Sequence, residues 1–442
     1  METIKPYMKT FYFSITAITF LVLSVFIFMY IFGNLADNRD AGPKKIYFAD
    51  NISISHKYAI EKFNQLHKGK IEVVPIDLSF EKFQTNERKE LLMRYLRSRS
   101  DRLDIFSIDQ IWVPRFAKFV EPLSNYFSTT ERENIIPYAL ESCFYKNQLV
   151  TIPLYIDVSV MYYRKDLLKN ISDYKEIKSK LDSSITWEEF INLGQRMKNF
   201  GYPFYLYQAE AFEGLMCSFV ELIESQNSKI LDGDSLKLNT PQANKALQLL
   251  VDLVNKYQLS PKEITNYKEY DTYYYFIDNN GIFLRGWPGL LKWYETKFND
   301  KSFADKIETV PLPHFKEGSK KSIIGGWNLM ISKYSSKKSE AIEFIKFLIQ
   351  EDTQKKFYEL GGYLPINAKI YEDKNYLNQN PELKFYKSIF KTSTRRPFLE
   401  KYTRYSDIIT YYLNRAIKNE ISVSEALSKA EKIINSEASY IK

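Results

Sequence analysis

From residue 44 onward, short runs rich in apolar residues alternate with stretches of helical periodicity. The runs that suit buried strands lie at residues 46–49, 71–74 and 104–108. Apolar residues at helical spacing mark the segments between them, residues 56–67 and 85–98. Alternation of strand and helix at these lengths is typical of parallel sheets covered by helices. The pattern therefore predicts an α/β fold with mainly parallel sheets.

Later helices are marked by start signals as well as by apolar faces. Thr186 and Glu189 have the spacing of a capping box, in which each side chain accepts a free backbone N–H of the first turn. Thr240 precedes Pro241 at a second helix start, and residues 422–425 open the last helix. Apolar faces follow at Ala243, Ala246, Leu247, Leu250 and Val254, and again at Ala341, Phe344, Ile345 and Leu348. No Pro/Gly/Ser-rich linker separates these elements, so any lobes must be joined by short crossings.

One long apolar segment near the N-terminus differs from the rest. Residues 11–32 carry no charge and, as a helix, would extend roughly 33 Å, enough to cross a bilayer. Lys5 and Lys9 precede this segment, so the positive-inside rule places the N-terminus in the cytoplasm and the remainder outside. Cleaved signal peptides have shorter apolar regions. We therefore favour a retained transmembrane signal anchor over a cleaved signal, which stays the alternative.

The scarcity of some residue types excludes more function classes than the abundance of others indicates. The net charge of +8 is spread over 62 basic and 54 acidic residues, which gives no basic block for nucleic acid. With three histidines and two cysteines in 442 residues, zinc clusters, Ser-His-Asp triads and disulfide frameworks are mostly excluded. We expect Cys143 and Cys217 to be buried thiols, although their pairing stays open. Aromatic residues, in contrast, make up 16% of the chain.

Several blocks, in order along the chain, resemble one protein family. They are residues 104–112 (DIFSIDQIW), 116–117 (FA), 121–123 (EPL), 152–157 (IPLYID), 162–168 (YYRKDLL), 186–189 (TWEE), 208 with 212–217 (FEGLMC), 281–288 (GIFLRGWP), 325–327 (GGW) and 396–397 (RP) with Tyr402. These blocks are similar to those of family 1 extracellular solute-binding proteins of ABC sugar importers, above all the trehalose/maltose-binding branch. The resemblance covers about residues 46–436.

The resemblance implies a type II periplasmic-binding-protein-like fold, with two α/β lobes around a cleft and a hinge of several strands. The N-terminal lobe would comprise residues 44–153 and 313–350, and the C-terminal lobe residues 154–312 and 351–442. Residues 1–43 would supply a cytoplasmic stub, the anchor and a short linker. The family is not enzymatic: it captures a sugar and presents it to ABC permease subunits. We accordingly expect a carbohydrate ligand, no cofactor or metal, no nucleic acid and a monomeric extracytoplasmic part.

A sugar site needs carboxylates and arginines for the hydroxyl rim and flat rings for the C–H faces. Asp109 and Asp157 each follow the carboxyl end of a probable strand, where ligands gather in open α/β sheets. Either alone would more often cap a turn or helix, but both match family positions. Tyr155 shares a strand face with Asp157, and Trp287 is a stacking candidate beside glycine.

The resemblance adds further positions to this list. Arg396 matches a sugar contact of the family, with a surface salt bridge as the alternative, and Gly326 offers backbone groups. The predicted ligand-binding residues are Asp109, Tyr155, Asp157, Gln208, Trp287, Gly326, Trp327 and Arg396. Glu213 is a weaker candidate that would serve equally well at a helix start. Three other residues are expected outside the site: Arg88 on a solvated helix face, Trp112 in packing, and Trp187 as a staple at its capping box.

Departures from the family pattern leave the particular sugar open. The family's Arg-Asn-Trp-Pro-Tyr is Arg-Gly-Trp-Pro-Gly at residues 285–289, which lacks an amide and a ring. Phe212 stands where a tyrosine is frequent, and residues 46–50 supply no recognisable family ligand. Two other function classes stay open on sequence alone. One is a sensory or scaffold protein that signals to a membrane partner, and the other is a carbohydrate-active enzyme using paired carboxylates.

Overall fold

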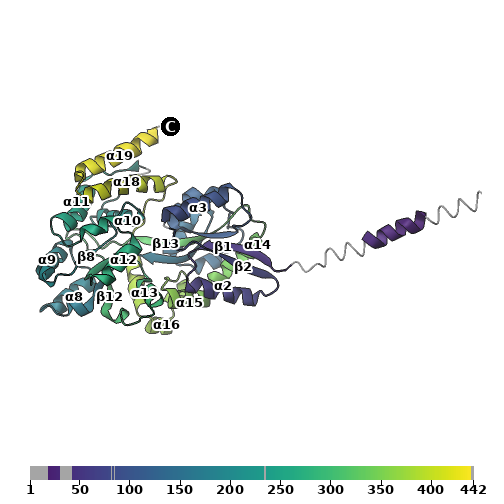
Figure 1. The fold of residues 1–442 in the computed structure, drawn as a ribbon, viewed down its shortest axis with the longest axis horizontal. Helices are drawn as coiled ribbons and strands as arrows, with labels where there is room; N and C mark the ends of the chain where they lie inside the picture. Colours follow the sequence, from purple (N-terminus) through teal and green to yellow (C-terminus); the bar gives the residue numbers. More distant parts are fainter. Residues whose placement is uncertain (1–17, 30–41, 81, 84, 233–234, 440–442) are drawn as a thin grey trace, which may run out of the picture. The chain divides into compact units, whose positions relative to one another are not determined.

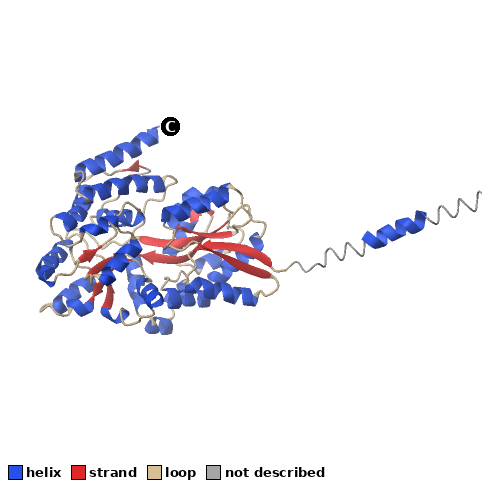
Figure 2. Cartoon of the chain, in the orientation of Figure 1, coloured by secondary structure: helices blue, strands red, loops and turns tan. Residues whose placement is uncertain are grey.

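The computed structural model describes residues 18–29, 42–80, 82–83, 85–232 and 235–439. These residues belong to two compact units, a small N-terminal unit and a large unit that contains nearly all of the sheets and helices. Figure 1 shows the fold coloured along the sequence, and Figure 2 shows the same view by secondary structure.

The small unit lies within residues 1–45 and 67–72 and includes a helix at residues 18–29. In this unit Lys45 pairs with Glu72 at 3.6 Å. The predicted membrane span covers residues 11–32, and its residues 11–17 and 30–32 lie outside the described residues. Most of the predicted stub and linker also lies outside them. Among the residues that are described, no helix is both long enough and apolar enough to cross a membrane.

The large unit, residues 46–66 and 73–442, is built around two main sheets. The five-stranded sheet has the order β2 (Ile71–Asp77), β1 (Lys44–Asp50), β3 (Ile105–Asp109), β13 (Ile324–Ile331), β6 (Ile152–Val158). The four-stranded sheet has the order β12 (Ile307–Val310), β7 (Val160–Arg164), β11 (Phe283–Gly286), β8 (Tyr205–Leu206). Two short two-stranded sheets pair β4 (Phe144–Tyr145) with β5 (Gln148–Leu149) and β9 (Leu231–Asp232) with β10 (Ser235–Leu236).

Both main sheets are mixed, so the prediction of mainly parallel sheets is wrong. β1 and β3 pair in parallel, but β13 runs antiparallel to both β3 and β6. In the second sheet β7 is antiparallel to β11 and β12, while β8 is parallel to β11. The strand–helix alternation that suggested parallel pairing extends only over the first three strands. Strands from later in the chain are inserted beside them in the opposite direction.

The chain passes between the two sheets at closely spaced points. Only Ser159 separates β6 from β7, and residues 311–323 connect β12 with β13. These crossings are bonded to each other, because Ile323 N donates to Ser159 Oγ at 2.8 Å and Ser159 N donates to Ile323 O at 3.0 Å. Short crossings joined in this way agree with a hinge made of several strands. The lobe boundaries at residues 153 and 312 stay a prediction.

Helices surround the sheets, with α3 and α2 on opposite sides of the five-stranded sheet and with α10, α11, α18 and α19 packed on one another (Figure 1). Their bounds are α2 Ile54–Leu66, α3 Thr85–Arg97, α4 Val113–Phe116, α5 Thr129–Glu133, α6 Pro137–Leu140, α7 Lys165–Leu168, α8 Tyr174–Ser183, α9 Trp187–Met197, α10 Glu213–Glu224, α11 Pro241–Asn255, α12 Glu269–Asp278, α13 Leu290–Phe298, α14 Lys338–Leu348, α15 Glu351–Gly361, α16 Lys374–Gln379, α17 Glu382–Phe390, α18 Tyr402–Ile417 and α19 Val423–Ser439.

The predicted helix starts are confirmed by their hydrogen bonds. Thr186 and Glu189 form the capping box of α9, and Thr240 Oγ1 accepts from the N–H of Ala243 at 3.1 Å at the start of α11. All five residues of the predicted α11 face are buried. Trp187 is buried beneath its capping box and packs edge-on against Phe190. Cys143 and Cys217 are buried free thiols.

Candidate ligand-binding site

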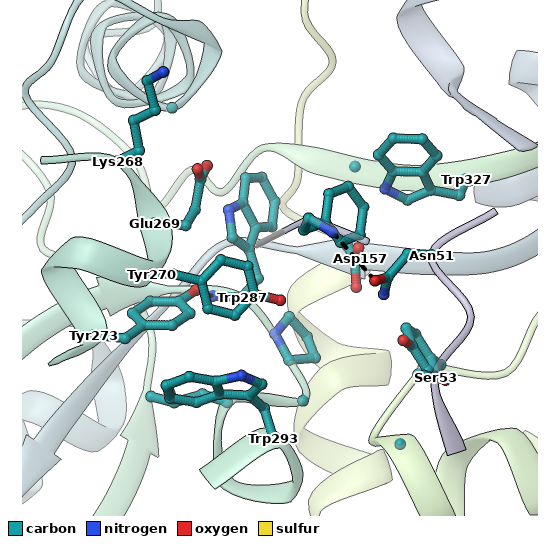
Figure 3. A pocket seen from close by; sticks show the side chains of 18 of the residues that line it. Asn51, Ser53, Asp157, Lys268, Glu269, Tyr270, Tyr273, Trp287, Trp293 and Trp327 are labelled. Atoms are coloured by element: carbon teal, nitrogen blue, oxygen red, sulfur yellow. Dashed lines mark hydrogen bonds between the residues drawn. The ribbon is translucent and has the colours of Figure 1, made fainter. Parts of the chain in front are cut away.

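A cavity of about 700 Å³ is lined on one side by the five-stranded sheet and on another by helices of the large unit. The five-stranded sheet contributes the ends of β3, β6 and β13, while α10, α12 and the segment from β11 into α13 supply the other side. Seven of the predicted ligand-binding residues line it together: Asp109, Tyr155, Asp157, Trp287, Gly326, Trp327 and Arg396. Their contact with a ligand stays a prediction, but the fold brings them to one place (Figure 3).

Strand register explains why three of these residues meet. Trp327 on β13 lies directly opposite Asp109 on β3 and directly opposite Tyr155 on β6. Residues opposite each other on antiparallel strands point to the same face of the sheet. Asp157 lies two residues beyond Tyr155 on β6, opposite Gly325. The floor of the cavity is thus one row of side chains across three adjacent strands.

Glycine is required at position 326 by its backbone and its surroundings. Gly326 has φ +143°, and a Cβ there would lie 2.8 Å from the carbonyl oxygen of Tyr155. Any side chain would therefore strain the backbone and collide with β6. This agrees with the expected close approach of backbone beside Trp327.

Gln208 is the one predicted contact that the structure does not bring to the cavity lining. It is fully buried, donates through Nε2 to the carbonyl of Arg285 at 3.0 Å, and accepts from Arg285 Nη1 at 3.1 Å. Its polar atoms are thus occupied by another residue of the protein. The structure thus places Gln208 behind the cavity lining, where it supports Arg285, and its contact with a ligand stays a prediction.

Arg396 is the centre of a buried ion network at one wall of the cavity. Its guanidinium donates to both carboxylate oxygens of Asp109, at 3.0 and 2.8 Å, and to Glu213 at 2.9 Å. Glu213 also accepts from the hydroxyls of Tyr402 at 2.5 Å and Ser406 at 2.7 Å. Burial raises the pKa of Glu213, although Arg396 opposes this. The expected alternative, a surface salt bridge, is therefore wrong, because Arg396 is only 4% exposed.

Two cavity carboxylates make no side-chain hydrogen bond to any other described residue. Asp157 is the first: burial and the nearby charge of Asp109 raise its pKa to about 7, and Arg396 opposes the shift. Glu269, in the first turn of α12, is the second, and burial raises its pKa to about 7 as well. Each of these carboxyl groups can therefore accept a hydrogen bond from a ligand hydroxyl. Within the described part of the chain, no cluster of His, Cys, Asp and Glu side chains could hold a metal ion.

Aromatic side chains cover more of the cavity than the sequence suggested. Tyr270 and Tyr273 from α12 and Trp293 from α13 line the same side as Trp287, whereas Trp327 lies opposite (Figure 3). The Trp293 ring centroid is 5.3 Å from that of Tyr270 and 6.0 Å from that of Tyr273. Sequence reasoning missed Glu269 and these rings. The only available signal was the tyrosine-rich run at residues 267–275, which has the helical spacing of an ordinary core face.

The backbone of Trp287 is fixed by two tyrosines. Tyr162 Oη donates to the carbonyl of Trp287 at 2.7 Å, and Trp287 N donates to Tyr273 Oη at 3.3 Å. Two further expectations concerned residues outside the cavity lining. Trp112 packs as predicted, against Phe116 and Trp327. Arg88, predicted to be solvated, is instead completely buried, because Asp50 and the carbonyl of Leu78 accept its hydrogen bonds.

Comparison with known proteins gives consistent matches over most of the chain. The family model for bacterial extracellular solute-binding proteins matches residues 48–355. A probable ABC transporter-binding protein from Deinococcus radiodurans is 26% identical over 353 residues, covering 79% of this chain and 83% of that protein. An arabinooligosaccharide-binding protein from Halalkalibacterium halodurans is 21% identical over 323 residues, covering 71% and 69% of the two chains.

Solved structures match over a similar extent. The maltose-bound MalE3 of T. maritima superimposes with a TM-score of 0.79 and 27% identity, covering 88% of this chain and 99% of its own. A solute-binding protein from Thermotoga lettingae with bound α-D-tagatose gives a TM-score of 0.76 and 21% identity, covering 90% and 99%. These matches show that the two sheets belong to the two-lobed periplasmic-binding-protein-like fold.

Proposed function

The chain belongs to the family of bacterial extracellular solute-binding proteins, and from this premise we propose that it binds a di- or oligosaccharide and delivers it to an ABC importer. The family and its structural neighbours are binding proteins of ABC transporters and not enzymes. The observation that carries the choice of ligand is the combination, in one cavity, of open carboxylates with aromatic walls.

Each part of the cavity suits one part of a sugar. Asp157 and Glu269 would accept hydrogen bonds from sugar hydroxyls, and the Arg396 network provides charged donors and acceptors in a fixed geometry. Trp287 and Trp327 offer flat rings for the C–H faces. The cavity volume of about 700 Å³ lies within the usual range for small-molecule sites. The similarity to a maltose-bound structure and to an arabinooligosaccharide-binding protein supports the same ligand class.

Delivery would depend on closure of the cleft around the ligand. A ligand shifts an open–closed equilibrium only when it contacts the closed form more favourably. Asp157 and Trp327 come from the five-stranded sheet, whereas Trp287 and Glu269 come from elements on the other side of the cavity. A sugar that bonds both sets would stabilise the closed form, which is the form that a permease would recognise.

We further propose that residues 11–32 anchor the protein in the cell membrane and that the remainder is extracytoplasmic. The uncharged stretch of 22 residues, with Lys5 and Lys9 before it, supports this orientation. Mass spectrometry of the mature N-terminus tests the anchor. An intact N-terminus in the membrane fraction is expected, and a mature chain that begins after residue 32 would contradict it.

Isothermal titration calorimetry of the full-length chain in detergent tests the function itself. The titrants are maltose, trehalose, maltotriose and an arabino-oligosaccharide. We expect at least one of these sugars to bind saturably and to change the tryptophan emission, because Trp287 and Trp327 line the cavity. Hydrolysis products in the sugar recovered afterwards would instead indicate an enzyme.

A further inference from the structure

A buried arginine lies over each of two tryptophans on opposite sides of the cavity. The guanidinium carbon of Arg88 is 4.4 Å from the ring centroid of Trp327, and that of Arg285 is 4.8 Å from the ring centroid of Trp287. Both arginines are completely buried, and neither belongs to the cavity lining. The two arginine–tryptophan contacts come from different parts of the fold. Arg88 lies on α3 and Trp327 on β13, whereas Arg285 lies on β11 and Trp287 directly follows that strand.

Arg88 is held beside Trp327 by contacts from several directions. Its Nη2 donates to Asp50 Oδ1 at 3.1 Å, and its Nη1 donates to the carbonyl of Leu78 at 2.9 Å. His56 Nε2 lies 3.1 Å from the other oxygen of Asp50, and the Phe80 ring centroid is 4.3 Å from the Arg88 guanidinium carbon. The rings of Phe80 and Trp327 are inclined by 67° to each other, so the two rings and the two acceptors enclose the guanidinium from different sides.

Arg285 is held by a similar arrangement of different residues. Its Nε and Nη2 donate to the two oxygens of Glu221, at 3.0 and 2.6 Å, and its Nη1 donates to Gln208. Glu221 is itself buried. The bidentate pair holds the guanidinium edge-on to the carboxylate, which leaves its flat face available to the indole of Trp287.

Stability alone is a poor reason to keep two buried ion pairs. Replacing such a pair by apolar residues of similar volume is often neutral or stabilising, because desolvation offsets the attraction. What the two pairs have in common is a cavity tryptophan whose ring centroid lies 4.4 or 4.8 Å from the guanidinium carbon. A planar guanidinium can bond a carboxylate with its edge and stack on a ring with its face, whereas an ammonium group cannot do both. A ring that is already held in place costs less entropy when a ligand packs on it.

We propose that Arg88 and Arg285 are positioning residues that hold Trp327 and Trp287 in the orientation needed for ligand stacking. This inference rests on the proposed function for its biological meaning. The order of the two rings, however, can be measured without any ligand. Failure of the positioning role can therefore be distinguished from failure of the proposed function.

The ligand-free test uses the full-length protein labelled with 5-fluorotryptophan, which gives ¹⁹F signals for the five tryptophans. Each signal is assigned by a Trp→Phe substitution. The double variant Arg285→Gln/Glu221→Gln removes the cation without leaving a buried unpaired charge, and Arg88→Gln/Asp50→Asn does the same at the other wall. We expect each to broaden or split the signal of its own tryptophan and to leave the opposite cavity tryptophan sharp.

A matched control is available away from the cavity. Arg164 is a buried arginine with a bidentate bond to Asp166, at 2.8 and 2.7 Å, and neither residue lines the cavity. Arg164→Gln/Asp166→Asn should leave the signals of Trp287 and Trp327 sharp. Single sharp signals for Trp287 and Trp327 in their own arginine variants would overturn the proposal. Broadening of every tryptophan signal in the cavity variants would overturn it too, since that indicates general loss of structure.

The second test is a thermodynamic cycle with maltose as the probe. The Arg285→Gln/Glu221→Gln change should weaken maltose binding about tenfold in the wild-type background. In a Trp287→Phe background the same change should cost less than about twofold, because the arginine acts through the ring. Equal losses in both backgrounds would overturn the proposal. If no sugar binds the wild-type protein, the proposed function fails and the fluorine signals still decide the positioning role.

Discussion

The ring of Trp287 lies against Gly325, so closely that a methyl group at position 325 would be 3.2 Å from Cζ3 of the indole. Trp287 follows a strand of the four-stranded sheet, and Gly325 belongs to β13 of the five-stranded sheet. Their contact is one of the places where the two sides of the cavity meet. It explains why a residue without a side chain stands directly before Gly326 and Trp327.

Gly325→Ala is therefore expected to displace the Trp287 ring. Overpacking of this kind costs about 1–3 kcal/mol of stability or is relieved by movement of the ring. Calorimetric titration with the best sugar ligand should show weaker binding, and thermal unfolding should show a small loss of stability. Gly42→Ala is the control, because a methyl group there has no neighbour within 4 Å. Wild-type affinity in Gly325→Ala would show that the Trp287 position does not matter for binding.

Asp157→Asn is expected to alter the pH dependence of stability. The folded-state pKa of Asp157 is raised from 3.8 to about 7, so between pH 4 and 7 the folded protein keeps a proton that the unfolded chain has lost. The Asp157 contribution to stability is thus present below pH 4 and is lost as the pH rises through 7. The asparagine variant avoids that loss and should be more stable than wild type by about 2 kcal/mol at pH 8.

Urea unfolding at pH 5, 6, 7 and 8 measures this effect. The advantage of Asp157→Asn over wild type should grow with pH. Asp305→Asn, which changes an exposed carboxyl outside the cavity lining, is the matched control. A constant difference between Asp157→Asn and wild type from pH 5 to 8 would show that Asp157 is not protonated in the empty cavity.

Gln208→Ala distinguishes support of Arg285 from the predicted ligand contact of Gln208. Removing this side chain leaves a buried donor of Arg285 without its acceptor, which should cost about 1–3 kcal/mol of unfolding free energy. Gln195→Ala, at an exposed glutamine, should change stability by no more than about 0.5 kcal/mol. Large loss of sugar affinity with unchanged stability would instead support Gln208 as a ligand contact.

Much of the fold could be predicted because its signals are local. The strands around Ile46, Ile71 and Ile105 and the caps at Thr186 and Thr240 depend on residues close in sequence. Strand direction depends instead on the partner. β13 joins β3 from more than two hundred positions away, and no local pattern records whether it arrives parallel or antiparallel. The mixed sheets were therefore not predictable from periodicity.

The same distinction applies to the site. Residues that match family blocks, such as Asp109 and Trp287, were found because the blocks carry them. Arg88 was misjudged because its helix reads as solvated, while its partner Asp50 lies 38 positions earlier. Glu269 and Trp293 were missed because a carboxylate at a helix start and an aromatic residue on a helix have ordinary structural roles. Their importance depends on the cavity that distant segments create.

The central claim is that the cavity holds a sugar between aromatic and carboxylate groups. Titration of the full-length wild-type protein and of Trp287→Ala with the same sugar panel tests it most directly. The account predicts saturable binding of at least one sugar, weakened by about 1–3 kcal/mol in folded Trp287→Ala. No heat with any sugar, or equal affinity in the two proteins, would contradict it.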